Sequence, residues 1–157
     1  MSDLKIYIES TYKGPSKCSG VGMYLIEWMK DGIPITRQGF CHQKEGTEAQ
    51  ICLKALINAF HLLRKPCQIL INTQSRTIFN TLNNGWLEGW QQSEWKNAKG
   101  EEVKNKDLWL MLLEKGAIHS YSVTTGHHEY KNVMESELKS EFERWKLEQI
   151  NNSKQNR

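Results

Sequence analysis

The sequence predicts a mixed α/β fold in which one five-stranded sheet is flanked by helices. Apolar residues alternate along three consecutive segments of the first 43 residues, recur at helical spacing in later segments, and form two further short runs between those helical segments. Strands joined by tight turns favour antiparallel pairing, and strands separated by helices favour parallel pairing. Both kinds of pairing are therefore expected in one sheet.

The first three predicted strands form an antiparallel meander. The stretch "LKIYIEST" alternates and predicts a strand that ends near Glu9. The turn-rich stretch "YKGPSKCSGVG" leads to a second strand in "GMYLIEWMK". A hairpin-type turn around Asp31 and Gly32 then connects this strand to a third one in "ITRQGFCHQ".

The pattern next changes to helical spacing. "GTEAQICLKALINAFHLLRK" predicts a helix with Thr47 as its N-cap, and Pro66 closes this segment. "CQILINT" predicts a fourth, buried strand, and "SRTIFNTLNNG" predicts a short helix that ends at Gly85.

Three elements are predicted in the rest of the chain. "KNKDLWLMLLEKGA" predicts a helix, "IHSYSVTT" a fifth strand, and "NVMESELKSEFERWKLEQI" a long C-terminal helix. Residues 1–150 are therefore expected to form a single domain, and the polar tail at 151–157 is expected to fray.

Composition limits the classes of protein to consider. The 157 residues are 38% hydrophobic and 25% charged, which suits one domain with a core of its own. No run approaches the ~20 apolar residues of a membrane span, and the start is too polar for a signal peptide, which predicts a cytoplasmic protein. A formal charge of +3 does not by itself indicate nucleic-acid binding. The four cysteines show neither zinc spacing nor a CxxC pair, so we expect buried, reduced thiols.

The end of the fourth predicted strand raises a question about function. Ligands of open α/β sheets gather beyond the carboxyl ends of strands, where a catalytic residue is usually an acid, a base or a nucleophile. Gln74 stands at this end and offers only an amide.

Five stretches in colinear order resemble type 1 ribonucleases H over nearly all of the chain. "IYIESTYKGPSKCSGVG" resembles the family's first strand and glycine loop, "TEAQICLKAL" its first helix, and "LINTQSRTI" its fourth strand. "GWLEGWQQSEWKNAKGEEVKNKDLW" resembles the protruding helix-loop of bacterial members, and "TGHHEYKNVMESELK" the final strand, histidine loop and helix. Residues 86–109 are the most specific match, because the Trp spacing and "VKNKDLW" fit without gaps. The resemblance implies a ribonuclease H-like fold with a Trp-rich protruding helix-loop.

The resemblance also implies a two-metal site, from which this sequence departs. The family cleaves the RNA strand of RNA/DNA hybrids with two Mg²⁺ ions held by four acids, assisted by a loop histidine. By position, Glu48 keeps one of these acids, and Glu9 keeps another with one extra methylene. Gln74 and Ser136 stand at the other two acids, and His127 matches the loop histidine.

A degenerate acidic metal site follows from this comparison. Glu9 and Glu48 are the predicted metal ligands, and two carboxylates poorly screen a close pair of dications, so metal binding is expected to be weak or absent. Glu135 and Glu137 flank Ser136, but adjacent helical residues point about 100° apart. Neither is expected to replace the missing acid unless the helix turns.

The substrate-binding surface is altered as well. The resemblance assigns substrate contacts to the following residues: Arg76, Trp86, Trp90, Trp95, Lys96 and Lys99. Uncharged residues at 91–93 replace the family's basic run, and Pro15 and Glu45 stand where the family has polar groups that face the minor groove. Because phosphate contacts supply most non-specific affinity, weak and salt-sensitive binding of a hybrid is expected.

Each of these residues also has a purely structural interpretation. Gln74 can hydrogen-bond neighbouring strand ends, which is the preferred interpretation if no metal binds. Glu48 can be a first-turn acid beside Thr47 that is favourable to the helix dipole. The tryptophans of the helix-loop can pack against one another, and His127 and His128 can be solvated loop residues.

The leading hypothesis is a ribonuclease H-like protein that is catalytically inactive or severely impaired and binds nucleic acid weakly or a protein partner. The first alternative is an active hybrid ribonuclease that uses Mg²⁺ or Mn²⁺ with an unusual ligand set. The second alternative is a structural scaffold, similar to the connection-type domains of reverse transcriptases.

Overall fold

A computed structural model describes residues 2–155 of the chain, which form five strands and five helices. The elements are β1 (Ser2–Ser10), β2 (Cys18–Lys30), β3 (Ile33–Gly46), α1 (Glu48–His61), β4 (Cys67–Thr73), α2 (Arg76–Asn83), α3 (Trp86–Gln92), α4 (Lys106–Gly116), β5 (Ser120–Thr124) and α5 (Lys131–Gln155). The predicted order of strands and helices is confirmed.

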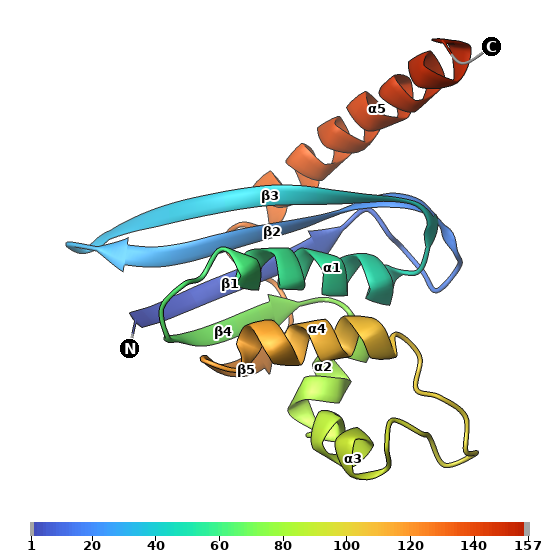
Figure 1. Ribbon diagram of the computed structural model, residues 1–157. Coiled ribbons are helices and arrows are strands. Elements are labelled where there is room, and N and C mark those ends of the chain that lie inside the picture. The colour runs from blue at the N-terminus through green and yellow to red at the C-terminus, as the bar shows by residue number, and fades with distance from the viewer. Residues whose placement is uncertain (1, 156–157) are drawn as a thin grey trace.

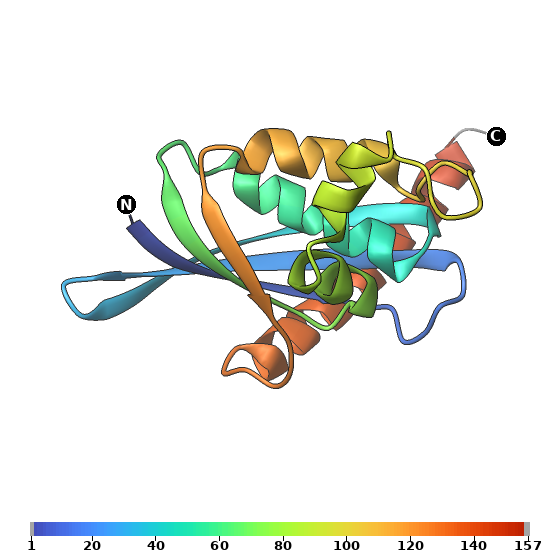
Figure 2. The same ribbon diagram turned by 90° about the horizontal axis from the view of Figure 1, so that it is seen from below.

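The five strands form one mixed sheet in the order β3-β2-β1-β4-β5. The meander β1-β2-β3 is antiparallel, whereas β1 pairs with β4, and β4 with β5, in parallel. Helices α1 and α4 cover one face of the sheet, and α5 crosses the opposite face before its C-terminal end projects beyond the sheet (Figures 1 and 2). The predicted mixed α/β sheet with flanking helices is therefore confirmed.

The register of β1 and β4 places two polar side chains at the same edge of the sheet. The parallel pairing runs as far as Ile8 on β1 and Thr73 on β4. The residues that follow these two are Glu9 and Gln74, so both side chains lie where the pairing of β1 and β4 ends. Parallel neighbours reach the same edge with their carboxyl ends, which is where ligand sites of such sheets form.

Helix α1 approaches the sheet closely because β2 has a glycine beneath it. A Cβ atom at Gly22 would lie 2.8 Å from Cγ1 of Ile51 and 3.0 Å from its backbone oxygen. Thr47 caps the helix through a reciprocal capping box with Gln50. This cap and the close packing fix the first turn of α1, and with it the side chain of Glu48.

Some boundaries differ from the predicted ones. The strands β2 and β3 are longer than predicted because they pair with each other from Cys18 to Gly46. Helix α5 continues to Gln155, so residues 151–155 are helical and not frayed, whereas 156–157 lie outside the described residues. All four cysteines are free, as expected, but only Cys52 and Cys67 are buried. No helix within residues 2–155 has the length and apolarity needed to span a membrane.

Candidate functional site

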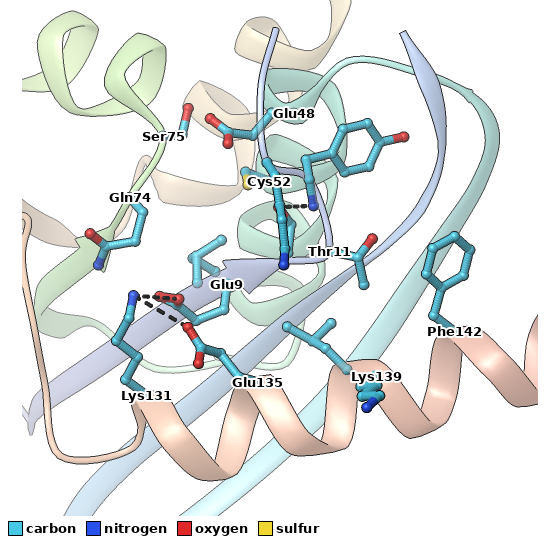
Figure 3. A pocket seen from close by; sticks show the side chains of 15 residues that line it. Glu9, Thr11, Glu48, Cys52, Gln74, Ser75, Lys131, Glu135, Lys139 and Phe142 are labelled. Carbon is cyan, nitrogen blue, oxygen red and sulfur yellow. Dashed lines mark hydrogen bonds and ion pairs between the residues drawn. The ribbon is translucent and has the colours of Figure 1, made fainter. Parts of the chain in front are cut away.

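A cavity of about 570 Å³ opens where the carboxyl ends of β1 and β4 meet the first turns of α1 and α5 (Figure 3). It brings together three of the sequence-predicted site residues, Glu9, Glu48 and Gln74. The charged side chains of its lining are three carboxylates and three ammonium groups: Glu9, Glu48, Glu135, Lys13, Lys131 and Lys139. The formal charge of the lining is therefore zero.

Glu9 is the most buried acid of this cavity, with its side chain only 6% exposed. Its Oε2 atom lies 3.3 Å from Nε2 of His128, and its Oε1 atom lies 3.5 Å from Nζ of Lys131. A buried carboxylate is tolerated only where such partners replace the lost hydration. Both oxygens of Glu9 are thus already engaged by groups of the protein itself.

Glu48 lies in the first turn of α1 and faces the same cavity. Burial raises the pKa of its carboxyl group, and the nearby charge of Glu9 raises it further. Two carboxylates that share a partly dry site repel each other, so the charged form of one is disfavoured. This pair is therefore held together by the fold against its own electrostatic repulsion.

Gln74 fills its position as a hydrogen-bond donor. Its Nε2 atom donates to Oδ1 of Asn72 at 3.1 Å and to the backbone oxygen of Gly126 at 2.9 Å. Its Oε1 atom accepts a longer hydrogen bond of 3.5 Å from Oγ1 of Thr125. The structural interpretation, in which Gln74 joins neighbouring strand ends, is confirmed by these contacts. A carboxylate could accept from Thr125, but it could not donate to Asn72 or Gly126.

The structure places Glu135 at the cavity and Ser136 outside it. Met134 and Leu138 of α5 are buried in a cluster with β1 and β2, which fixes the rotation of the helix. This rotation turns Glu135 into the cavity and leaves Ser136 exposed and outside its lining. Glu137 instead accepts a hydrogen bond from Gln38 on β3. The expectation that the helix would have to turn before Glu135 could take the site is therefore not met.

The two loop histidines have different environments. His127 is exposed, in agreement with a solvated loop residue, and does not line the cavity. His128 is 8% exposed and stacks on Tyr7 with ring centroids 4.5 Å apart. Its Nδ1 atom accepts the backbone N–H of Tyr130, so in the neutral ring Nε2 carries the proton and donates it toward Glu9. Of the two, only His128 contacts the site.

A groove of about 850 Å³ adjoins the cavity and shares Glu48 and Gln74 with it. Arg76, Trp86 and Trp90 line this groove. The other substrate-binding candidates do not: Trp95 is 8% exposed, and Lys96 and Lys99 are exposed on the loop outside the lining. The groove therefore gathers half of the residues that the resemblance assigned to the substrate.

The tryptophans of the helix-loop pack mainly against one another, as the structural interpretation expects. The ring centroid of Trp90 lies 6.0 Å from those of Trp95 and Trp109 and 6.4 Å from that of Trp86. Trp86 alone among the four remains 43% exposed. It is the ring that is free to stack on a ligand.

Sequence reasoning did not single out Lys131, which lines the cavity, and named Ser136 where the structure has Glu135 in the lining. The available signal was the i, i+4 spacing of Lys131 and Glu135, whose charged atoms lie 3.6 Å apart. Spacing alone does not reveal which helical face meets the cavity. The adjacent pair of His127 and His128 was likewise ambiguous, because neighbouring loop residues commonly point in different directions.

The arrangement does not fit a pair of divalent ions. No group of three or more His, Cys, Asp or Glu side chains within residues 2–155 is placed to share one ion. Glu9 and Glu135 both contact Lys131, and Gln74 contributes no charge. Two dications would add four positive charges to a lining that is already neutral.

The comparisons with known proteins agree with this architecture. The family model described as RNase H matches residues 1–151. A protein named ribonuclease H from Caldicellulosiruptor saccharolyticus is 33% identical over 129 residues, which cover 81% of this chain and 86% of that protein.

Two solved structures are similar in fold. LC9-RNase H1, described as a type 1 RNase H with the type 2 active-site motif, matches with a TM-score of 0.69 and 19% identity over 82% of this chain and 64% of that one. LC11-RNase H1 in complex with RNA/DNA hybrid matches with a TM-score of 0.52 and 16% identity over 86% of this chain and 92% of that one.

Proposed function

Because the chain belongs to the ribonuclease H family, we propose that it binds an RNA/DNA hybrid in the groove beside the acidic cavity, and that its hydrolysis of the RNA strand is abolished or severely impaired. The observation that carries the impairment is Gln74. Its amide nitrogen is committed to Asn72 and Gly126, at the position where the family has a metal-ligand acid.

The groove supports binding of a duplex. Arg76 is exposed at the first turn of α2, and the exposed ring of Trp86 lies in the same lining. Lys13 and Lys104 add two further positive charges to this surface. Phosphates are held by such cations, and aromatic rings stack on bases or sugars that are accessible. The structurally similar LC11-RNase H1 was solved with an RNA/DNA hybrid.

The proposal is tested by fluorescence anisotropy with a labelled RNA/DNA hybrid, with duplex DNA of the same sequence as the competitor. We expect hybrid binding that weakens steeply with salt. The slope of log affinity against log salt concentration should decrease in magnitude by about 1 in Arg76→Gln. Arg64→Gln is the matched control, because Arg64 is exposed before β4, at the opposite end of that strand from Gln74. Equal affinity of both variants and wild type would contradict the assignment of the groove.

Hydrolysis is measured in parallel on the same hybrid, with Mg²⁺ and with Mn²⁺. We expect at most trace cleavage above that of the metal-free control, even at stoichiometric enzyme. Robust cleavage by wild type that disappears in Glu48→Gln would show that the enzyme is active and would overturn the impairment.

The position of Glu135 favours a second candidate, an active ribonuclease that uses Mg²⁺ or Mn²⁺ with an unusual ligand set. Glu135 supplies a third carboxylate to the cavity beside Glu9 and Glu48. Oxygen ligands of this kind suit either metal. This candidate predicts that Glu135→Gln and Glu9→Ala each abolish metal-dependent cleavage, whereas Glu137→Gln, two positions further along α5 and outside the cavity lining, leaves it unchanged.

A further inference from the structure

Lys131 lies between two acids of the cavity. Its Nζ atom is 3.5 Å from Oε1 of Glu9 on β1 and 3.6 Å from Oε1 of Glu135 on its own helix (Figure 3). The ammonium group thus joins β1 to α5 across the cavity. A bridging cation in an acidic site performs the same electrostatic task as a bound metal ion, because it screens the repulsion between carboxylates.

The placement of Lys131 opposes the preference of its own helix. Lys131 is the first residue of α5, and the first turn of this helix contains no acid. A positive charge at a helix N-terminus is unfavourable, because the dipole of the helix presents positive charge there as well. The contact with Glu9, whose side chain is 6% exposed, compensates for this position.

Lys139 offers an internal comparison. It lies on the same helix and lines the same cavity, yet it forms no ion pair with any residue that the structure describes. The two lysines therefore contribute equally to the formal charge of the cavity, but only Lys131 contacts its carboxylates.

We propose that Lys131 is a tethered cation that takes the place of a divalent ion in this cavity and blocks metal binding there. Its single positive charge lies between the carboxylates of Glu9 and Glu135 in the free protein and screens their mutual repulsion. A divalent ion binds to these two carboxylates only after the side chain of Lys131 withdraws. The inference rests on the proposed function, since it gives a cause for the impaired hydrolysis, but it concerns the cavity and requires no nucleic acid.

The test is a comparison of Lys131→Met with Lys139→Met by calorimetry and thermal unfolding, with Mn²⁺ and Mg²⁺ as the probes and no hybrid present. Both substitutions remove one positive charge from the same cavity. We expect Lys131→Met to bind Mn²⁺ at least ten-fold more tightly than wild type and to gain thermal stability with the ion. Lys139→Met and wild type should behave alike. Lys131→Arg keeps the cation and should restore the weak binding of wild type.

Two outcomes of the Mn²⁺ titration would overturn the proposal. Equal Mn²⁺ affinity of Lys131→Met and wild type, or an equal gain in Lys139→Met, would show that Lys131 does not block the cavity. Circular dichroism checks that Lys131→Met is folded, and Lys131→Gln repeats the test if it is not. Failure of hybrid binding in the anisotropy experiment would refute the proposed function without changing these metal titrations.

Discussion

Nε2 of Gln74 donates a hydrogen bond of 2.9 Å to the backbone oxygen of Gly126, and thereby ties the end of β4 to the loop that follows β5. The same nitrogen also donates to Asn72. This loop continues to His128, which contacts Glu9. The amide of Gln74 therefore helps to position His128, which donates to the buried carboxylate of Glu9. A carboxylate in place of the amide would face two acceptors, on Asn72 and Gly126.

The first prediction concerns Gln74→Glu, which keeps the size of the side chain and removes both donors. We expect the free energy of unfolding to fall by about 1–3 kcal/mol, because the acceptors on Asn72 and Gly126 lose their partner and face a charge. Urea denaturation measures the change. Gln68→Glu, at an exposed position of β4, is the control, with an expected effect within about 0.5 kcal/mol. Equal stability of both variants would contradict the role of the amide.

The second prediction concerns Glu48→Gln, which should stabilise the protein at neutral pH. The pKa of Glu48 is raised in the folded state by burial and by Glu9, so its charged form costs stability above that pKa. The cost disappears below the unfolded pKa, near 4.5, where the group is protonated in both states. Melting temperatures measured from pH 7 to pH 4 should show a gain over wild type that vanishes toward the acid end. A gain that is independent of pH would refute this explanation.

The third prediction concerns an ion-pair network that holds α5 against β3. Hydrogen bonds from Arg144 and from His42 lower the pKa of Glu141 to about 2. Nε2 of His42 lies 2.6 Å from the Glu141 carboxylate. A lowered pKa stabilises the folded state above the unfolded value of about 4.5, and this stability is lost as the pH falls toward 2. Glu141→Gln should cost about 1–3 kcal/mol at pH 6 and progressively less below pH 4.5.

The control for this network is Glu143→Gln, on the exposed face of the same helix. It should change stability by less than about 0.5 kcal/mol across the pH range. Denaturant unfolding at several pH values separates the two variants. A constant difference between Glu141→Gln and wild type from pH 6 to pH 2 would argue against an electrostatic origin.

The fourth prediction separates the packing role of the tryptophans from their binding role. Trp95 is 8% exposed, so Trp95→Ala should lower stability by about 3 kcal/mol or more. Trp86 is 43% exposed in the groove, so Trp86→Ala should change stability by less than about 1 kcal/mol. The same Trp86 variant should bind hybrid about five-fold more weakly or worse, because a stacked ring is lost. Thermal unfolding and anisotropy check the two effects, and unchanged affinity in Trp86→Ala would remove the ring from the binding surface.

Periodicity and capping residues were sufficient to predict the fold class and most elements. Alternation located the meander, and Thr47 with helical spacing located α1, because local hydrogen bonds and the burial of one face act within a short stretch of chain. The resemblance placed Glu9, Glu48 and Gln74 at one site. The parallel register of β1 and β4 brings Glu9 and Gln74 together, and the first turn of α1 adds Glu48.

Which residues are available to the cavity, including an amide at Gln74, follows from their order along the chain. Which side chains of α5 and of the histidine loop reach the cavity depends on tertiary packing. The rotation of α5 depends on how Met134 and Leu138 pack against the sheet, which turns Glu135 inward, leaves Ser136 exposed and sets Lys131 beside Glu9. Burial of His128 against Tyr7 likewise selects it over His127. These choices depend on contacts between residues that are more than a hundred positions apart, which no local pattern records.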